Sequence, residues 1–518
     1  MKLFFVFVFI ILIVPIIDGA KILAYIPSPA ISHQAPFHAL FQELARRGHQ
    51  VDVITTDPAF PKGSTPPNLT EIDVHDVSYG AVVEKFRNST STNHGDIFSQ
   101  MWIGLNMFTE FMDDQLSVKE VHDAIHGKKY DLLFLEACAR PALALTHVHK
   151  VPVILLSSFG PMFNIMNVMG APTHPLLYQS FTRQRIYNLT IWEKINELYV
   201  HYRLHIMYAN VEKRENKMLQ KHFGTDLPSL STMYDNIDMV FLNTHPILED
   251  NRPVPPSVVY IWGSHKRPEK ELSKDLKEFL DSSKHGVIYM SFGTNTDPSL
   301  LPAKKIKNFV KVFCQLPYDV LWKWNKDELP GNCKNIKFGK WFPQSDLLRH
   351  QNVKAFVTQG GLQSTEEAIR AGVPLIGIPM GRDQFANVEK YVHHNIGVQL
   401  NLKSLTEDNF KDALRTVIED ESYRRNIKTL DALMQDEPMS GLERAIWWTE
   451  HVLRHGGARH LRAPAANISL VQYLELELVA VVVLTLSAIF VIAFTVLIFC
   501  CRLVRKRNAV YVKKTKIH

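Results

Sequence analysis

The chain has 518 residues, of which 46% are hydrophobic and 21% charged, and this ordinary globular usage excludes a disordered or collagen-like chain. Five cysteines are too few for a small disulfide-stabilised scaffold, and the length predicts two or three domains. Much of the formal charge of +6 comes from residues 502–518, which carry seven basic residues and no acidic one. This leaves a net charge of −1 for residues 1–501, so the composition gives no indication of nucleic-acid binding.

Residues 1–20 have the pattern of a secretory signal peptide. Lys2 precedes an uninterrupted apolar run over residues 3–17, and the small residues Gly19 and Ala20 follow. Asp18 departs from the usual cleavage-site pattern, so an N-terminal membrane anchor is the alternative interpretation.

The first half of the body alternates strand-like and helical segments. The predicted strands are 22–26, 51–55, 130–135 and 153–156, and the predicted helices are 37–47, 97–126, 139–149 and 192–219. Strands separated by helices and short loops are typical of βαβ units, so we expect a parallel sheet.

A proline-rich stretch interrupts this pattern. Its prolines are Pro246, Pro253, Pro255 and Pro256. Because proline cannot occupy the middle of a helix or of a central strand, we predict a linker over 246–257. It would separate an N-terminal domain (21–245) from a C-terminal domain (258–470).

The alternating pattern then resumes. Strands are predicted at 287–292, 320–324, 336–338, 355–358 and 375–378, and helices at 303–315, 364–371 and 387–394. The sequence therefore predicts an α/β protein with two facing Rossmann-like domains and with ligands at the carboxyl ends of the strands.

The C-terminal region predicts a membrane anchor. Residues 478–501 carry no charge and are long enough to cross a bilayer as one helix. Basic residues follow at once, so the positive-inside rule predicts a cytosolic tail at 502–518 and a lumenal or extracellular body. The end of the tail, 514–518, resembles the retrieval signal of endoplasmic reticulum membrane proteins, with a generic basic tail as the alternative. We expect a single-pass type I glycoprotein, with candidate glycosylation sites at Asn68, Asn88, Asn188 and Asn467.

The strand at 355–358 runs into Gly360 and Gly361, and a helix is expected to open near Ser364. Glycine lets the backbone approach an anion closely, and a helix N-terminus offers free N–H groups, so this segment predicts a diphosphate site. The dinucleotide-binding pattern Gly-x-Gly-x-x-Gly and the phosphate-binding lysine loop do not occur here, which excludes nicotinamide and P-loop nucleotide binding.

Neighbouring residues suit the other parts of a nucleotide sugar. Glu367 can bind two ribose hydroxyls with one carboxylate, Asp383 and Gln384 suit sugar hydroxyls, and Trp341 offers a flat face to a base. Residues 341–350 and 356–384, with the wording Gln359-Gly-Gly-Leu-Gln-Ser-Thr-Glu-Glu-Ala, resemble the signature of the UDP-glycosyltransferases, inverting enzymes of the GT-B fold. The wording is similar to the arthropod branch. The resemblance implies that the N-terminal domain (21–245) binds the acceptor and the C-terminal domain (258–470) binds the UDP-sugar.

The resemblance implies a role for each matching residue. Trp341 would stack on uracil, Gln344 would contact the nucleoside, and Glu367 would bind the ribose. The diphosphate would be held by Gln359, Gly360, Gly361, Gln363 and Ser364, the sugar by Asp383 and Gln384, and the loop beside the phosphates would contain Ser291, Gly293 and Thr294. Many vertebrate members have histidine at the position of Gln359, whose neutral amide can donate to a phosphate oxygen but cannot carry a positive charge.

Glycosyl transfer to a hydroxyl needs a general base. His33 follows the first predicted strand, within a βα loop, and matches the family's catalytic histidine. Glu136, at the end of the strand 130–135, stands where the family usually has aspartate and would orient His33. A strand-end salt bridge is the alternative role for Glu136. The resemblance implies direct displacement with inversion and no cofactor beyond UDP-sugar as co-substrate, and the sequence indicates no metal site.

The sequence leaves several donor sugars and acceptors open. The resemblance implies a UDP-hexose donor, with glucose expected and galactose or glucuronic acid left open, and small lipophilic acceptors as in detoxification. Bulky apolar residues that form either an acceptor pocket or core are Phe98, Met101, Trp102, Met107, Phe108, Phe111 and Met112. A lipid glycosyltransferase and a non-catalytic binder of lipophilic molecules remain alternatives, and the sequence leaves open homo-oligomerisation and the pairing of Cys138, Cys314 and Cys333.

Overall fold

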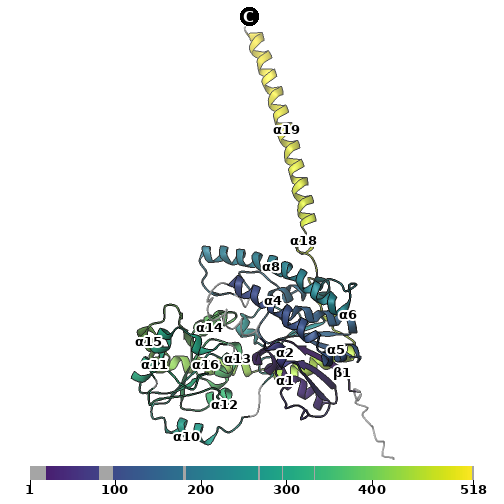
Figure 1. Cartoon of the computed structure of the whole chain (residues 1–518). Helices are drawn as coiled ribbons and strands as arrows, with labels where there is room; N and C mark the ends of the chain where they lie inside the picture. Colours follow the sequence, from purple (N-terminus) through teal and green to yellow (C-terminus); the bar gives the residue numbers. More distant parts are fainter. Residues whose placement is uncertain are drawn as a thin grey trace, which may run out of the picture. The chain divides into compact units, whose positions relative to one another are not determined.

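The computed structural model describes residues 19–80, 97–178, 183–265, 269–294, 296–331 and 333–515. These residues form two units, one ending at Ala463 and one beginning at Pro464, and each is described by itself (Figure 1). Residues 1–18 of the predicted signal peptide and the candidate glycosylation site Asn88 lie outside the described residues.

The first sheet of the larger unit has seven parallel strands in the order β3-β2-β1-β4-β5-β6-β7. Their bounds are β1 Lys21–Ile26, β2 Gln50–Thr55, β3 Leu69–Asp73, β4 Leu132–Glu136, β5 Val153–Ser157, β6 Met239–Leu242 and β7 Val258–Tyr260. Alternate residues of its central strands enter two different cores, one on each face, as expected for a parallel sheet covered by helices on both sides. The strands predicted at 22–26, 51–55, 130–135 and 153–156 are confirmed as β1, β2, β4 and β5.

The sequence missed β3, β6 and β7. The strand β7 lies in residues that the sequence assigned to the second domain, but it pairs with β6 in the first sheet. The predicted linker 246–257 contains one short 3-10 helix, Pro246–Glu249, and leads into β7 rather than away from the sheet. The domain limits themselves stay a prediction.

Helices connect the strands of this sheet. Their bounds are α1 Ile31–Arg46, α2 His75–Ser78, α4 Ile97–Leu116, α5 Lys119–His126, η1 Arg140–Ala144, α6 Leu145–His149, α7 Phe163–Val168, α8 Ile191–Phe223 and α9 Leu230–Met233. The single helix predicted over 97–126 is wrong, because the chain turns at Ser117 and Val118 between α4 and α5. The helix α8 packs along α4, as Figure 1 shows.

The second sheet has six parallel strands in the order β10-β9-β8-β11-β12-β13. The bounds of its strands are β8 Val287–Ser291, β9 Asp319–Lys323, β10 Ile336–Gly339, β11 Val353–Thr358, β12 Leu375–Gly377 and β13 Gly397–Gln399. The helices of this half are α10 Lys274–Ser282, α11 Ala303–Gln315, α12 Gln344–Leu348, α13 Leu362–Ala371, α14 Gln384–His393, α15 Glu407–Glu419 and α16 Glu421–Gln435. Every strand predicted here is present. A disulfide joins Cys314 to Cys333, and Cys138 keeps a free thiol.

The helix α17 (Gly441–His455) follows the second sheet in sequence but packs against the first. Ala445, Ile446 and Val452 belong to the same buried core as Phe37 and Leu40 of α1. At the surface, the guanidinium of Arg47 lies 3.0 Å from the carboxylate of Glu450. The chain therefore crosses between the two halves twice.

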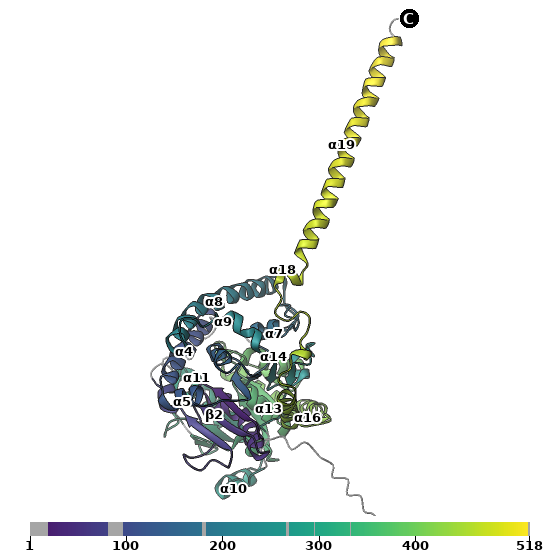
Figure 2. The ribbon, with the colours of Figure 1, turned by 90° about the vertical axis from the view of Figure 1, so that its right-hand side faces the viewer.

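The smaller unit contains α18 (Leu470–Tyr473) and the long helix α19 (Leu476–Thr515), which Figure 2 shows as one continuous helix. Residues Leu476–Asn508 of α19 contain an apolar segment long enough to cross a membrane, with a mean hydropathy of 2.9 over the most apolar window. The predicted span 478–501 lies within this helix.

Candidate active site

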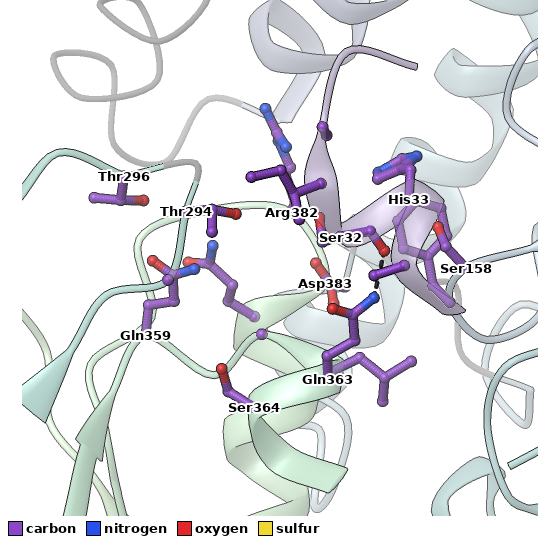
Figure 3. A pocket seen from close by; sticks show the side chains of 18 of the residues that line it. Ser32, His33, Ser158, Thr294, Thr296, Gln359, Gln363, Ser364, Arg382 and Asp383 are labelled. Carbon is purple, nitrogen blue, oxygen red and sulfur yellow. Dashed lines mark hydrogen bonds between the residues drawn. The ribbon is translucent and has the colours of Figure 1, made fainter. Parts of the chain in front are cut away.

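A cavity of about 700 Å³ opens between the two halves (Figure 3). Each sheet extends in both directions from one pair of neighbouring strands, which is β1 and β4 in the first sheet and β8 and β11 in the second. The strand order reverses at this pair. The residues that follow these strands line the cavity, as expected at the reversal point of a doubly wound sheet. Of the predicted site residues, all but Glu136 and Gly360 line this cavity.

His33 lies in the first turn of α1, where it lines the cavity and is 8% exposed. The sequence analysis placed it in a loop and began the helix at residue 37, which is wrong. Pro36 lies inside this helix and, having no N–H group, cannot donate to the carbonyl of Ser32. The side-chain amide of Gln363 from the second half donates to that carbonyl instead (Figure 3).

Glu136 ends β4 and reaches His33 despite its longer side chain. Its Oε1 lies 2.5 Å from Nδ1 of His33, and both side chains are buried. Burial alone would raise the pKa of Glu136, but the His33 ring holds that pKa below its usual value, with help from the Cys138 thiol and the Ser28 hydroxyl. Because Nδ1 bonds to the carboxylate, Nε2 is the ring nitrogen that can act on a ligand.

Ser28 and Cys138 also contact this carboxylate. The backbone N–H of Ser28 donates to Oε2 at 3.0 Å, and its hydroxyl donates to Oε1 at 2.5 Å. The thiol of Cys138 donates to Oε1 at 2.9 Å. Burial raises the pKa of this thiol well above its usual value, and the neighbouring Glu136 charge raises it further. The sequence analysis did not connect these two residues with the site, although both directly follow strands at the reversal point.

The second half presents the N-terminus of α13 to the cavity. Gly360 has a φ of 90°, and a Cβ there would lie 2.4 Å from the Val388 side chain, so glycine is required. Gly361 is the N-cap residue, and among the described residues no side chain caps this helix. The first N–H groups of α13 are thus available to an anion, and Ser364 adds its hydroxyl.

A hydrogen-bond network positions Gln344 and Glu367. The amide of Gln344 donates to Glu367 at 2.7 Å and to the Ser364 hydroxyl at 3.0 Å, and its carbonyl accepts from Tyr289 at 3.2 Å. Burial raises the pKa of Glu367, and the bond from Gln344 opposes this. The carboxylate is therefore fixed in direction before any ligand arrives.

Trp341 is 63% exposed at the rim, so one face is open to a flat ligand. The ammonium of Lys323 lies 4.9 Å from the centre of its ring and donates to the carbonyl of Gly293 at 2.7 Å. The sequence analysis missed Lys323. Because this residue ends β9 at the carboxyl edge of the second sheet, the argument used for His33 could have found it.

Asp383 and Gln384 begin α14 at the floor of the cavity. The carbonyl of Gln384 accepts from the backbone N–H groups of Met380 and Gly381, so its amide nitrogen is the part that can contact a ligand. Burial raises the pKa of Asp383, while the amide of Asn387 donates to its carboxylate at 2.8 Å and opposes the rise. These two residues thus offer one acceptor and one donor.

The bulky residues of α4 divide between cavity and core. Met101, Met107 and Phe108 line the cavity, whereas Phe111 and Met112 are buried in the core. The remaining two lie elsewhere: Trp102 is 46% exposed, and Phe98 contacts Tyr199 and Arg203 of α8. The cavity therefore has an apolar wall, which Phe159 and Met162 extend. The ring of Phe159 lies 4.9 Å from that of His33.

A family model described as "UDP-glucoronosyl and UDP-glucosyl transferase" matches residues 20–513. The chain belongs to this family. An ecdysteroid UDP-glucosyltransferase of Spodoptera littoralis nuclear polyhedrosis virus is 32% identical to it over 91% of this chain and 95% of the relative. UDP-glucosyltransferase 2 of Dactylopius coccus is 33% identical over 91% of each chain, and UDP-glucuronosyltransferase 2B14 of Oryctolagus cuniculus is 28% identical over 86% of this chain and 87% of the relative.

Solved structures support the fold. A UDP-glucose: anthocyanidin 3-O-glucosyltransferase in complex with UDP superposes with a TM-score of 0.57 at 17% identity, covering 85% of this chain and all of the other. The calicheamicin glycosyltransferase CalG4 gives 0.57 at 15% identity, covering 84% and 98%. The protein is thus a UDP-glycosyltransferase with the GT-B fold, while the roles of individual site residues stay predictions.

Proposed function

We propose that this UDP-glycosyltransferase transfers glucose from UDP-glucose to a hydroxyl group of a small lipophilic acceptor, with inversion at the anomeric carbon. The buried pair of His33 and Glu136 carries the proposal, because a protein that merely binds ligands needs no base beside an apolar wall. The names of relatives support glucose as the donor sugar and a steroid as one class of acceptor.

The geometry of His33 and its neighbours supports the following chemical step. Nε2 of His33 takes the hydroxyl proton as the acceptor oxygen attacks the anomeric carbon, and the bond from that carbon to the β-phosphate oxygen breaks. Glu136 keeps the imidazole in the required tautomer and stabilises the imidazolium that forms. The N-terminus of α13 and the side chains of Gln359 and Ser364 stabilise the negative charge of the departing UDP. Asp383 and Gln384 bind the hydroxyls of the sugar.

We also propose that α19 anchors the protein in the endoplasmic reticulum membrane, with the larger unit in the lumen and the tail 502–518 in the cytosol. The apolar length of α19 and the basic residues after it support this orientation. Glycosylation at Asn68, Asn188 or Asn467 would report a lumenal body.

The test measures UDP release from UDP-glucose by membranes that contain the full chain, with phenols, alcohols and a steroid as acceptors. Wild type should release UDP only when an acceptor is present, and His33→Ala should lower the rate by about 10²- to 10⁴-fold. UDP binding that is unchanged in the variant would exclude misfolding. The product should show the anomeric configuration opposite to that of UDP-glucose. Donor binding without release on any soluble acceptor would contradict the proposal and favour a lipid acceptor or a binding protein.

A further inference from the structure

Three metal-ligating side chains meet at the wall of the cavity, which His33 and Cys138 line. Nδ1 of His33, a carboxylate oxygen of Glu136 and Sγ of Cys138 all lie within 4.8 Å of one another. The sulfur lies 3.7 Å from Nδ1 and 2.9 Å from Oε1. His33 lies in α1, whereas Glu136 ends β4 and Cys138 follows it, so no local spacing of ligands in the sequence marks this cluster.

We propose that this cluster, the HEC site, binds Zn²⁺ and that the bound ion inhibits glycosyl transfer. The binding of the ion does not depend on the proposed function. The inhibition rests on the proposed role of His33 as the base.

The ligand types and spacings suit zinc. Nitrogen and oxygen ligands bind Zn²⁺ at about 2.0–2.2 Å and thiolate sulfur at about 2.3 Å, usually in a tetrahedron. In such a tetrahedron the sulfur and nitrogen lie about 3.6 Å apart, and the observed separation is 3.7 Å. The carboxylate oxygen lies closer to both than a tetrahedron allows, so Glu136 must retreat by less than about 1 Å.

Charge also favours a divalent cation. Glu136 is acidic and Cys138 loses its thiol proton to solvent on binding, so two negative ligands would face the ion together with a neutral imidazole. The Ser28 hydroxyl lies 3.6 Å from the Cys138 sulfur and can supply a fourth ligand, as can water from the cavity. His33 and Cys138 both line the cavity, which gives the ion its entry path.

The inhibition follows from the tautomer of His33. When Zn²⁺ occupies Nδ1 of a neutral imidazole, the ring proton sits on Nε2. Nε2 can then no longer accept the proton of the incoming hydroxyl. The same ion removes Glu136 from its position as the partner of the imidazolium.

Binding is tested with Co²⁺ as the probe, on the purified full-length chain in detergent. Cys500 and Cys501 are also free thiols, so the parent protein is Cys500→Ser/Cys501→Ser, in which Cys138 keeps the one thiol outside the disulfide. We expect one Co²⁺ per chain to produce a thiolate-to-metal absorption band in the near ultraviolet, and Zn²⁺ to abolish it. Cys138→Ala should lose the band, and its affinity for Zn²⁺ should fall by more than about tenfold, because loss of an outer-shell partner alone costs about 10- to 100-fold.

Exposed histidine pairs provide a contrast. His201 lies near His205 and His451 near His460, with 3.2 and 3.1 Å between Nε2 atoms, so both pairs can bind Co²⁺ without a thiolate band. Co²⁺ binding without the band, or with the same band in Cys138→Ala, would overturn the HEC site.

Inhibition is tested by UDP release at fixed free Zn²⁺, set with a chelator buffer. Each variant is compared with its own metal-free rate, because Cys138 touches the proposed catalytic pair. The rate of the parent should fall at least tenfold and recover on chelation, whereas the rate of Cys138→Ala should fall only at a Zn²⁺ concentration more than about tenfold higher. Full activity with the HEC site occupied would overturn the inhibition. Metal binding in a protein without any transfer activity would support the HEC site and contradict the proposed function.

Discussion

The two halves assemble their parts of the site differently along the chain. In the second half, most of the predicted donor-binding residues come from residues 341–384, where α12, β11, the glycine pair, α13 and β12 follow each other directly. In the first half, His33 and Glu136 are 103 residues apart and meet only because β1 and β4 are neighbours in the sheet. Contiguous sites are visible in sequence patterns, whereas sites made by sheet neighbours depend on the topology.

The comparison predicts that a substitution at the His33–Glu136 pair in the first half lowers kcat. Glu136→Gln keeps the shape of the side chain but removes the charge that orients His33, so kcat should fall by about 10²-fold. The KM for UDP-glucose should change less than about twofold, because Glu136 does not line the cavity. Steady-state kinetics on UDP release would measure both.

A matched control for this variant is Asp131→Asn, which likewise removes one carboxylate, here from the residue just before β4. Asp131 accepts from the backbone N–H of Lys21, at the opposite end of the strand from Glu136. Its kcat should stay near that of wild type. A loss of UDP-glucose affinity in Glu136→Gln, with kcat unchanged, would contradict the division of labour between the halves.

A substitution among the predicted donor-binding residues of the second half should lower the affinity for UDP-glucose. Glu367→Gln replaces a charged acceptor by a neutral one, so the KM for UDP-glucose should rise by about tenfold, equivalent to about 1.4 kcal/mol. The KM for the acceptor should not change. Isothermal titration with UDP alone would show the same loss, and unchanged UDP binding would remove Glu367 from the donor site.

Substitutions in the apolar wall formed by α4 should change the KM for the acceptor alone. Met101→Ala removes apolar contact area from the cavity, and the KM for a bulky phenol should rise by about fivefold, or about 1 kcal/mol. Trp102→Ala, one residue along the same helix and outside the cavity lining, is the control and should leave this KM unchanged. Equal effects of the two variants would place the acceptor elsewhere.

The smallest expected effect is on the pH dependence of donor binding. Because burial raises the pKa of Glu367, this carboxylate takes up a proton at a higher pH than an exposed glutamate. The charged form is the better acceptor for ribose hydroxyls, so the KM for UDP-glucose should rise a few-fold as the pH falls toward 5. Glu367→Gln should lack this part of the profile, and an identical profile in both proteins would contradict the assignment.

Sequence reasoning worked where the signal was local. The buried strands before Ser291 and Gln359 read as apolar runs, and the glycine pair marks the turn into α13. Sequence-based prediction failed where the hydrogen-bond partner of a residue comes from a distant part of the chain. The start of α1 was missed because Gln363, more than 300 residues away, donates to the carbonyl that Pro36 cannot serve. Similarly, nothing near Cys138 in the sequence indicates that its thiol touches the carboxylate beside His33.

The return of α17 to the first half limits how this protein can be recombined with relatives. An exchange of residues 21–260 alone would set a foreign α1 against the native Ala445, Ile446 and Val452, whose shapes have to fit the same core. The structural piece to which we assign acceptor binding, the first sheet with α17, is therefore discontinuous in the sequence. A chimera that keeps its stability has to take α17 together with the first sheet.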